Sequence, residues 1–156
     1  MKRIFNTPSV FCRGIAGFSL LLLASTTLYA EGMSIALNGA AEVPPVTTAA
    51  TGAGEIAVSP DHAVSGSIKV TGFTATMAHV HEGAAGKNGP VVVTLTKASD
   101  DTFTVPSGAK LSDAQYASYL AHGLYVNVHS VANPGGEIRA QLTPKEAAKA
   151  PMRSGY

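Results

Sequence analysis

Histidine is the residue type in this chain best suited to chemistry. The 156 residues include five, His62, His79, His81, His122 and His129. Neutral imidazole binds copper and zinc well, and its second nitrogen can be oriented by a backbone or carboxylate partner. Histidines that converge in the fold would therefore form a metal site. The alternative is that each ring is solvated or hydrogen-bonded without metal.

Two predicted strands would position three of these histidines. His79 and His81 flank a valine at the end of one alternating run, so their side chains leave the same face about 7 Å apart along the backbone. Tyr125, Asn127 and His129 alternate with valines in a second run and also share one face. If the two strands are neighbours or face each other, a third ring nitrogen joins the first pair.

Two further side chains are candidates for a fourth ligand. Met77 lies two residues before His79 on the same predicted face, and a thioether is a soft donor suited to Cu(I). His122 follows a predicted short helix, where the helix dipole alone also favours an imidazole. The alternatives are that Met77 fills the core and that His122 is a surface residue.

Composition and turn residues predict an all-β fold. Only 13% of the residues are charged, and the chain has 16 glycines, nine prolines and no tryptophan. Alternating apolar and polar residues predict short strands, separated by clusters of turn-forming residues. The clearest runs are 34–37, 54–58, 65–70, 75–81, 91–96, 124–129 and 137–142. With one short helix over 112–120, about seven to eight strands indicate a Greek-key β-sandwich.

The two ends of the chain differ from the middle. Residues 1–30 are typical of a secretory signal peptide, with a basic start, an apolar run of about 14 residues that is too short to span a membrane, and expected cleavage near Ala30. Cys12 would leave with this leader, so no disulfide is expected. The mature protein is expected in the periplasm or outside the cell, as one domain over 31–142 with a flexible tail over 143–156.

The charge balance argues against nucleic acid or an anionic membrane as partner. The whole chain has 11 Lys and Arg against 10 Asp and Glu. Three of the basic residues lie in the predicted leader, so 8 minus 10 leaves the mature chain at −2. Without a basic stripe, the protein lacks the cations that neutralise phosphates.

Several motifs in order resemble the CHRD family, a domain first noticed in chordin and common in exported bacterial proteins. The resemblance runs from Leu37 to Leu142, nearly the whole mature domain. It is carried by the segments 37–46, 79–83, 89–92, 125–129 and 133–142. CHRD domains occur in varied contexts, so this resemblance implies a family and does not by itself imply an activity.

A second likeness is to the copper-zinc superoxide dismutases. The segment 79–82 is similar to their copper-ligand strand, 128–129 to their last copper-ligand strand, and 135–139 to the loop that carries an anion-guiding arginine. The likeness implies a superoxide-dismutase-like sandwich in which the three histidines of these strands ligate one copper ion. It also implies that Arg139 guides a small anion such as superoxide.

The same comparison implies a site without zinc. Val91 stands after the Gly-Pro pair, where those enzymes place the histidine that bridges copper and zinc. No downstream histidine and aspartate supply a zinc pocket, and the disulfide of those enzymes has no counterpart here. The likeness therefore implies a copper-only site.

Three functions follow as hypotheses. The first is an exported protein that holds one copper ion through His79, His81 and His129 for storage, delivery or buffering. The second is a superoxide-dismutase-like enzyme, in which copper changes oxidation state while superoxide reaches an open position. The third is an extracellular interaction module in which the histidines only form structural hydrogen bonds.

Overall fold

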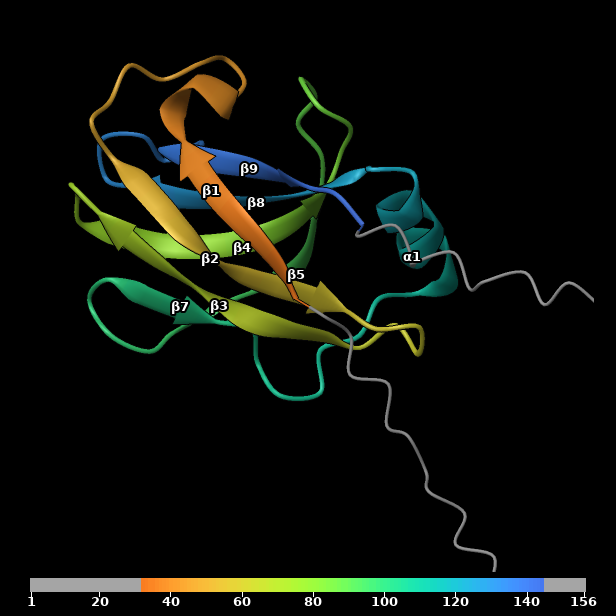
Figure 1. Ribbon diagram of the computed structural model, residues 1–156. Coiled ribbons are helices and arrows are strands. Elements are labelled where there is room, and N and C mark those ends of the chain that lie inside the picture. Colours follow the sequence, from red (N-terminus) through yellow and green to blue (C-terminus); the bar gives the residue numbers. More distant parts are fainter. Residues whose placement is uncertain (1–31, 145–156) are drawn as a thin grey trace, which may run out of the picture.

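A computed structural model describes residues 32–144, in which nine strands form one antiparallel sheet (Figure 1). The predicted signal peptide, its cysteine and most of the predicted tail lie outside these residues. The strands are β1 (Met33–Asn38), β2 (Thr51–Val58), β3 (Val64–Thr71), β4 (Ala75–Glu82), β5 (Val91–Thr94), β6 (Thr96–Lys97), β7 (Thr102–Thr104), β8 (Leu124–Ser130) and β9 (Ile138–Leu142). Their order in the sheet is β5-β4-β8-β9-β1-β2-β3-β7-β6.

One segment brings the two ends of this sheet together. β5 pairs with β4 at one end and β6 pairs with β7 at the other, and only Leu95 separates β5 from β6. The backbone N–H of Leu95 donates to the carbonyl of Ala78 at 3.0 Å, and Lys97 Nζ donates to the carbonyl of Ala75 at 3.1 Å. The sheet is therefore a nearly closed barrel, which leaves little edge available for other strands.

Strand alternation separates an apolar inside from a polar outside. Ala78 and Val80 of β4 and Val126 and Val128 of β8 are at most 1% exposed and belong to the apolar core. Residues between them point to the outer face, as the period of two requires. On β4, β8 and β9 that outer face carries histidine, tyrosine, asparagine and arginine side chains. Burial of the valines and alanines in the core therefore determines which side chains lie together on the outer face.

The all-β prediction with non-consecutive strand pairing is confirmed. Nine strands are present where seven to eight were expected, because the run 91–96 is divided at Leu95 and because β7 has only three residues, too few to show alternation. The pairs β9–β1, β4–β8 and β3–β7 join strands that are not consecutive in sequence, as a Greek-key arrangement requires. A short 3₁₀ helix, η1 (Gly39–Ala41), follows β1.

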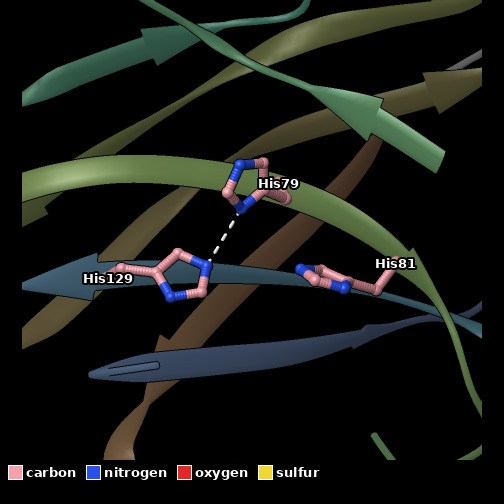
Figure 2. Close-up of side chains that lie close together, drawn as sticks. All are labelled: His79, His81 and His129. Carbon is pink, nitrogen blue, oxygen red and sulfur yellow. Dashed lines mark hydrogen bonds between the residues drawn. The ribbon is translucent and has the colours of Figure 1, made fainter. Parts of the chain in front are cut away.

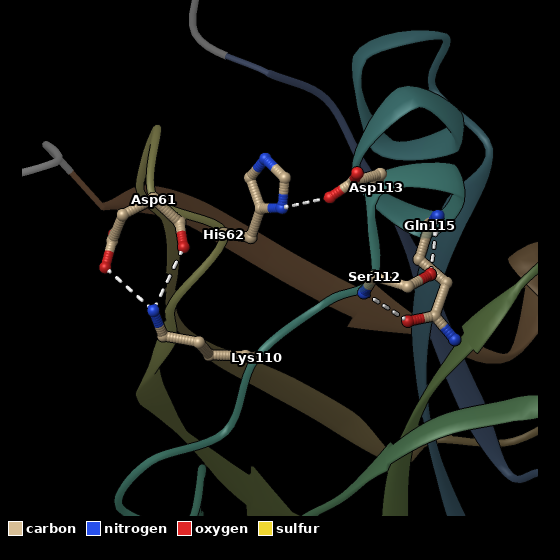
Figure 3. A network of polar contacts seen from close by, with 6 residues as sticks. All are labelled: Asp61, His62, Lys110, Ser112, Asp113 and Gln115. Carbon is tan, nitrogen blue, oxygen red and sulfur yellow. Dashed lines mark hydrogen bonds and ion pairs between the residues drawn. The ribbon is translucent and has the colours of Figure 1, made fainter.

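The predicted helix is also confirmed, as α1 (Asp113–Leu120). Ser112 caps its N-terminus by accepting from the backbone of Gln115 at 3.2 Å, and the Gln115 side chain accepts in return from the backbone of Ser112 at 2.8 Å (Figure 3). His62 contacts the same end of the helix, with its Nδ1 3.5 Å from Asp113 Oδ1. Within residues 32–144, no helix is long and apolar enough to cross a membrane.

Candidate metal centre

Pairing of β4 with β8 brings the predicted histidines together. In this antiparallel pair His79 lies opposite Asn127, His81 lies opposite Tyr125, and His129 lies opposite Met77. Residues directly opposite have Cβ atoms about 5 Å apart, and their diagonal neighbours remain within reach of long side chains. The condition set by the sequence, that the two strands be neighbours, is therefore met.

The three imidazoles of the cluster converge on one point of the outer face (Figure 2). His79 Nδ1 lies 3.0 Å from His129 Nε2, and one ring nitrogen from each of His79, His81 and His129 lies within 4.8 Å of the others. The centroid of the His79 ring is 5.5 Å from that of His81 and 4.9 Å from that of His129. Three nitrogens at this spacing can hold one metal ion.

Backbone carbonyls orient two of the rings. His81 Nδ1 lies 2.9 Å from the carbonyl oxygen of Gly89, and His129 Nδ1 lies 2.9 Å from that of Pro134. A carbonyl only accepts, so each neutral ring carries its proton on Nδ1 and keeps a lone pair on Nε2. His81 Nε2 is buried and has no hydrogen-bond partner. This pattern is the one by which proteins prepare histidines as metal ligands.

Burial disfavours the charged form of two of the three rings, His79 and His129. Burial, and then the neighbouring His129 and His81, lower the pKa of His79 from 6.5 to about 4. Burial also lowers the pKa of His129, although the Pro134 carbonyl opposes that shift. In the neutral form these two rings can bind a cation without first losing a proton. His81 and His129 are buried whereas His79 is half-buried, so the cluster is accessible on the His79 side.

A loop between β4 and β5, residues 83–90, contacts the cluster through the Gly89 carbonyl and is held by Arg139. The Arg139 guanidinium donates to the carbonyl oxygens of Ala84 and Lys87, at 3.3 and 2.9 Å, and to Asn88 Oδ1 at 3.2 Å. Arg139 is only 1% exposed. This position supports a role in holding the loop. Guidance of an anion, as the superoxide dismutase likeness implies, would need the guanidinium to leave these contacts.

The two candidates for a fourth ligand lie in different places. Met77 is directly opposite His129 on the outer face and is 48% exposed, so it is not a core residue. His122 is exposed between α1 and β8, with a backbone φ of 60°. Among the described residues, the histidine cluster contains His79, His81 and His129 and does not include His122. The strand register therefore favours Met77 over His122 as a neighbour of the site.

Sequence reasoning missed the roles of Tyr125 and Asn127. Alternation placed both on the His129 face, but which side chains they meet depends on pairing with β4 and β9. The Tyr125 ring stacks on His81, with centroids 4.9 Å apart and planes at 6°, and Arg139 Cζ lies 3.4 Å from the Tyr125 ring centroid. Asn127 is 3% exposed and its Oδ1 has no partner.

Fold and site together define a small β-barrel domain with a three-histidine cluster on its outer face. The sequence-family model of the CHRD domain matches residues 33–142, which contain the entire barrel and the cluster. The chain belongs to the CHRD domain family. Neither the curated proteins nor the solved structures gave a match.

Proposed function

We propose that this protein is exported and holds one copper ion through His79, His81 and His129. The observation that carries the proposal is the convergence of three ring nitrogens within 4.8 Å, two of them on rings oriented by backbone carbonyls. Export rests on the leader-like residues 1–30, and the protein would act in the periplasm or outside the cell. Storage, delivery or buffering of copper are the tasks that such a site serves.

The chemistry of the donor set favours copper. The cluster offers three imidazole nitrogens with neither thiolate nor carboxylate among them. For a given nitrogen site, affinity among divalent first-row metals is highest for Cu²⁺, above Zn²⁺. Met77, half-exposed and opposite His129, adds a thioether on the same face that is suited to Cu(I). A site of this kind can accept copper in either oxidation state.

A superoxide-dismutase-like activity is the second candidate. One observation favours it: His79 is only half-buried, so a small molecule can approach the cluster from that side. When bound, copper would supply one-electron chemistry, and the three histidines would hold it beside this opening. Because Arg139 is enclosed by loop carbonyls, attraction of an anion by that residue is not part of this candidate.

Titration of the purified protein with Cu²⁺ against a competing chelator tests the proposal. We expect one ion per chain in the wild type, and at least a 100-fold weaker affinity in His129→Ala because the ring provides one of three ligands. The matched control is His122→Ala, which removes an exposed histidine outside the cluster and should leave the affinity unchanged. Equal affinity in all three proteins would leave the interaction module without metal as the better account.

A further inference from the structure

Asn127 lies in the middle of the histidine cluster. On β8 it stands between Tyr125 and His129, and across the strand pair it is directly opposite His79. His81 and His129 are therefore its diagonal and same-strand neighbours on one face. The side chain is 3% exposed although its amide is polar. Asn127 thus occupies the strand position that neighbours all three histidines on the outer face.

The orientation of this amide leaves a buried oxygen unpaired. Asn127 Nδ2 donates to the carbonyl oxygen of Gly135 at 3.4 Å, so the amide nitrogen faces the loop 131–137. Asn127 Oδ1 then points away from that loop and has no hydrogen-bond partner. Buried polar atoms without a partner are rare in folded proteins, and each one calls for an explanation.

Among residues 32–144, three buried side-chain atoms lack a partner, and two of them belong to this site. They are His81 Nε2 and Asn127 Oδ1, and the third is Glu42 Oε1. A cation held by the cluster would satisfy the lone pair of His81 Nε2. Asn127 Oδ1 is an acceptor, so it requires a hydrogen-bond donor. A water molecule bound to the metal would supply this donor, because its O–H groups remain free to donate to Asn127 Oδ1.

We propose that Asn127 Oδ1 accepts a hydrogen bond from a water molecule that occupies the coordination position left open by the three histidines. This inference rests on the proposed function, because the water is held by the metal. Asn127 is then a positioning residue, which favours a fourth ligand that can donate a hydrogen bond, such as water, over an anion that cannot. An aprotic ligand at the same position would face the oxygen lone pairs of Asn127 without a proton to share.

Azide titration of the full chain loaded with one Cu²⁺ tests this selection, because azide is an aprotic anion. In Asn127→Leu we expect azide to bind about five- to tenfold more tightly than in the wild type, the worth of one hydrogen bond to the competing water. Copper affinity should fall by no more than about the same five- to tenfold, since the variant loses only this hydrogen bond and keeps all three ligands. Gln115→Leu is the matched control. It removes an amide at the start of α1, outside the cluster, and should leave the azide and copper affinities at their wild-type values.

A second measurement does not depend on whether the variant folds. Pulsed EPR of the copper-loaded wild type in H₂O and D₂O should show exchangeable protons of one bound water. Absence of those protons would overturn the inference, as would unchanged azide affinity in a folded Asn127→Leu. Loss of copper affinity in that variant as large as in His129→Ala would also overturn it, because Asn127 would then be a ligand. Failure of the wild type to bind copper would instead refute the proposed function.

Discussion

The imidazole of His81 and the phenol ring of Tyr125 are stacked, with centroids 4.9 Å apart and planes at 6°. Arg139 Cζ lies 3.4 Å from the same Tyr125 ring, so the tyrosine connects a candidate ligand with the buried guanidinium. The Tyr125 hydroxyl also accepts from the backbone N–H of Gly89, whose carbonyl accepts a hydrogen bond from His81 Nδ1. The orientation of one candidate ligand, His81, is therefore coupled through Tyr125 to Arg139 of β9.

Loss of the Arg139 guanidinium should destabilise the whole domain. In Arg139→Gln, loop carbonyls and Asn88 Oδ1 lose their charged donor, so we expect the free energy of unfolding to fall by about 2–4 kcal/mol. Urea denaturation measures this change. Lys110→Gln is the control, because its pair with Asp61 is exposed to solvent and should contribute little to stability. An equal effect of the two substitutions would contradict this role of Arg139.

Gly89 should be required for the orientation of His81. A Cβ at Gly89 would overlap the carbonyl oxygen of Glu82, so Gly89→Ala must shift the carbonyl that accepts from His81 Nδ1. Loss of such a partner weakens metal binding about 10- to 100-fold, which a competitive copper titration would detect. Gly86→Asn is the control in the same loop, because Gly86 has a φ of 74° that asparagine tolerates and its Cβ would meet open space. Wild-type affinity in Gly89→Ala would refute this prediction.

Glu42 should make the stability of the domain depend on pH. Burial raises the pKa of this carboxyl from 4.5 to about 7, against the attraction of Arg139, while the nearby Glu137 adds to the increase. The folded protein then holds a proton more tightly than the unfolded chain, so the stabilising contribution is complete below the unfolded pKa and is lost as the pH rises through about 7.

Glu42→Gln removes that dependence. Relative to wild type, the variant should have a similar free energy of unfolding near pH 4, and one higher by about 1–3 kcal/mol near pH 8, where the wild type must bury a charge. Urea denaturation of both proteins at the two pH values gives the difference in the free energy of unfolding between variant and wild type. Titration of the histidines contributes equally to both proteins and cancels from this difference. A difference that is the same at both pH values would show that Glu42 titrates alike in the folded and unfolded states.

Copper should stabilise the folded state by linkage. The unfolded chain has no preformed cluster, so at a free concentration of about 100 times Kd one ion adds about 2.7 kcal/mol to the free energy of unfolding. We expect the melting temperature of the wild type to rise with Cu²⁺ concentration. In His79→Ala/His129→Ala the rise should be absent, and a similar rise in both proteins would place copper elsewhere.

The sequence was sufficient to predict the strands that carry the histidines. Alternation around Val80 and Val128 is a local property, and it determines which side chains share a face. Local signals also predicted α1, namely Ser112 as an N-cap and Gly123 beyond the end of the helix, and the structure adds a capping box between Ser112 and Gln115.

Long-range pairing could not be predicted in this way. Closure of the barrel depends on β5 and β6 pairing with opposite ends of the sheet, and β7 is too short to show a period. The arginine expected as an anion guide is enclosed because the 83–90 loop folds over it, which no spacing indicates. The unpaired oxygen of Asn127 likewise follows from its neighbours on β4 and from Gly135.

The number of imidazoles on the bound ion shows whether the three histidines share one copper. Pulsed EPR of the protein with one equivalent of Cu²⁺ measures couplings to the remote ring nitrogens and so reports how many histidines coordinate. We expect three imidazoles in the wild type and two in His129→Ala, since β4 supplies two and β8 supplies one. A wild-type count that His129→Ala leaves unchanged would contradict the claim that the two strands share one ion.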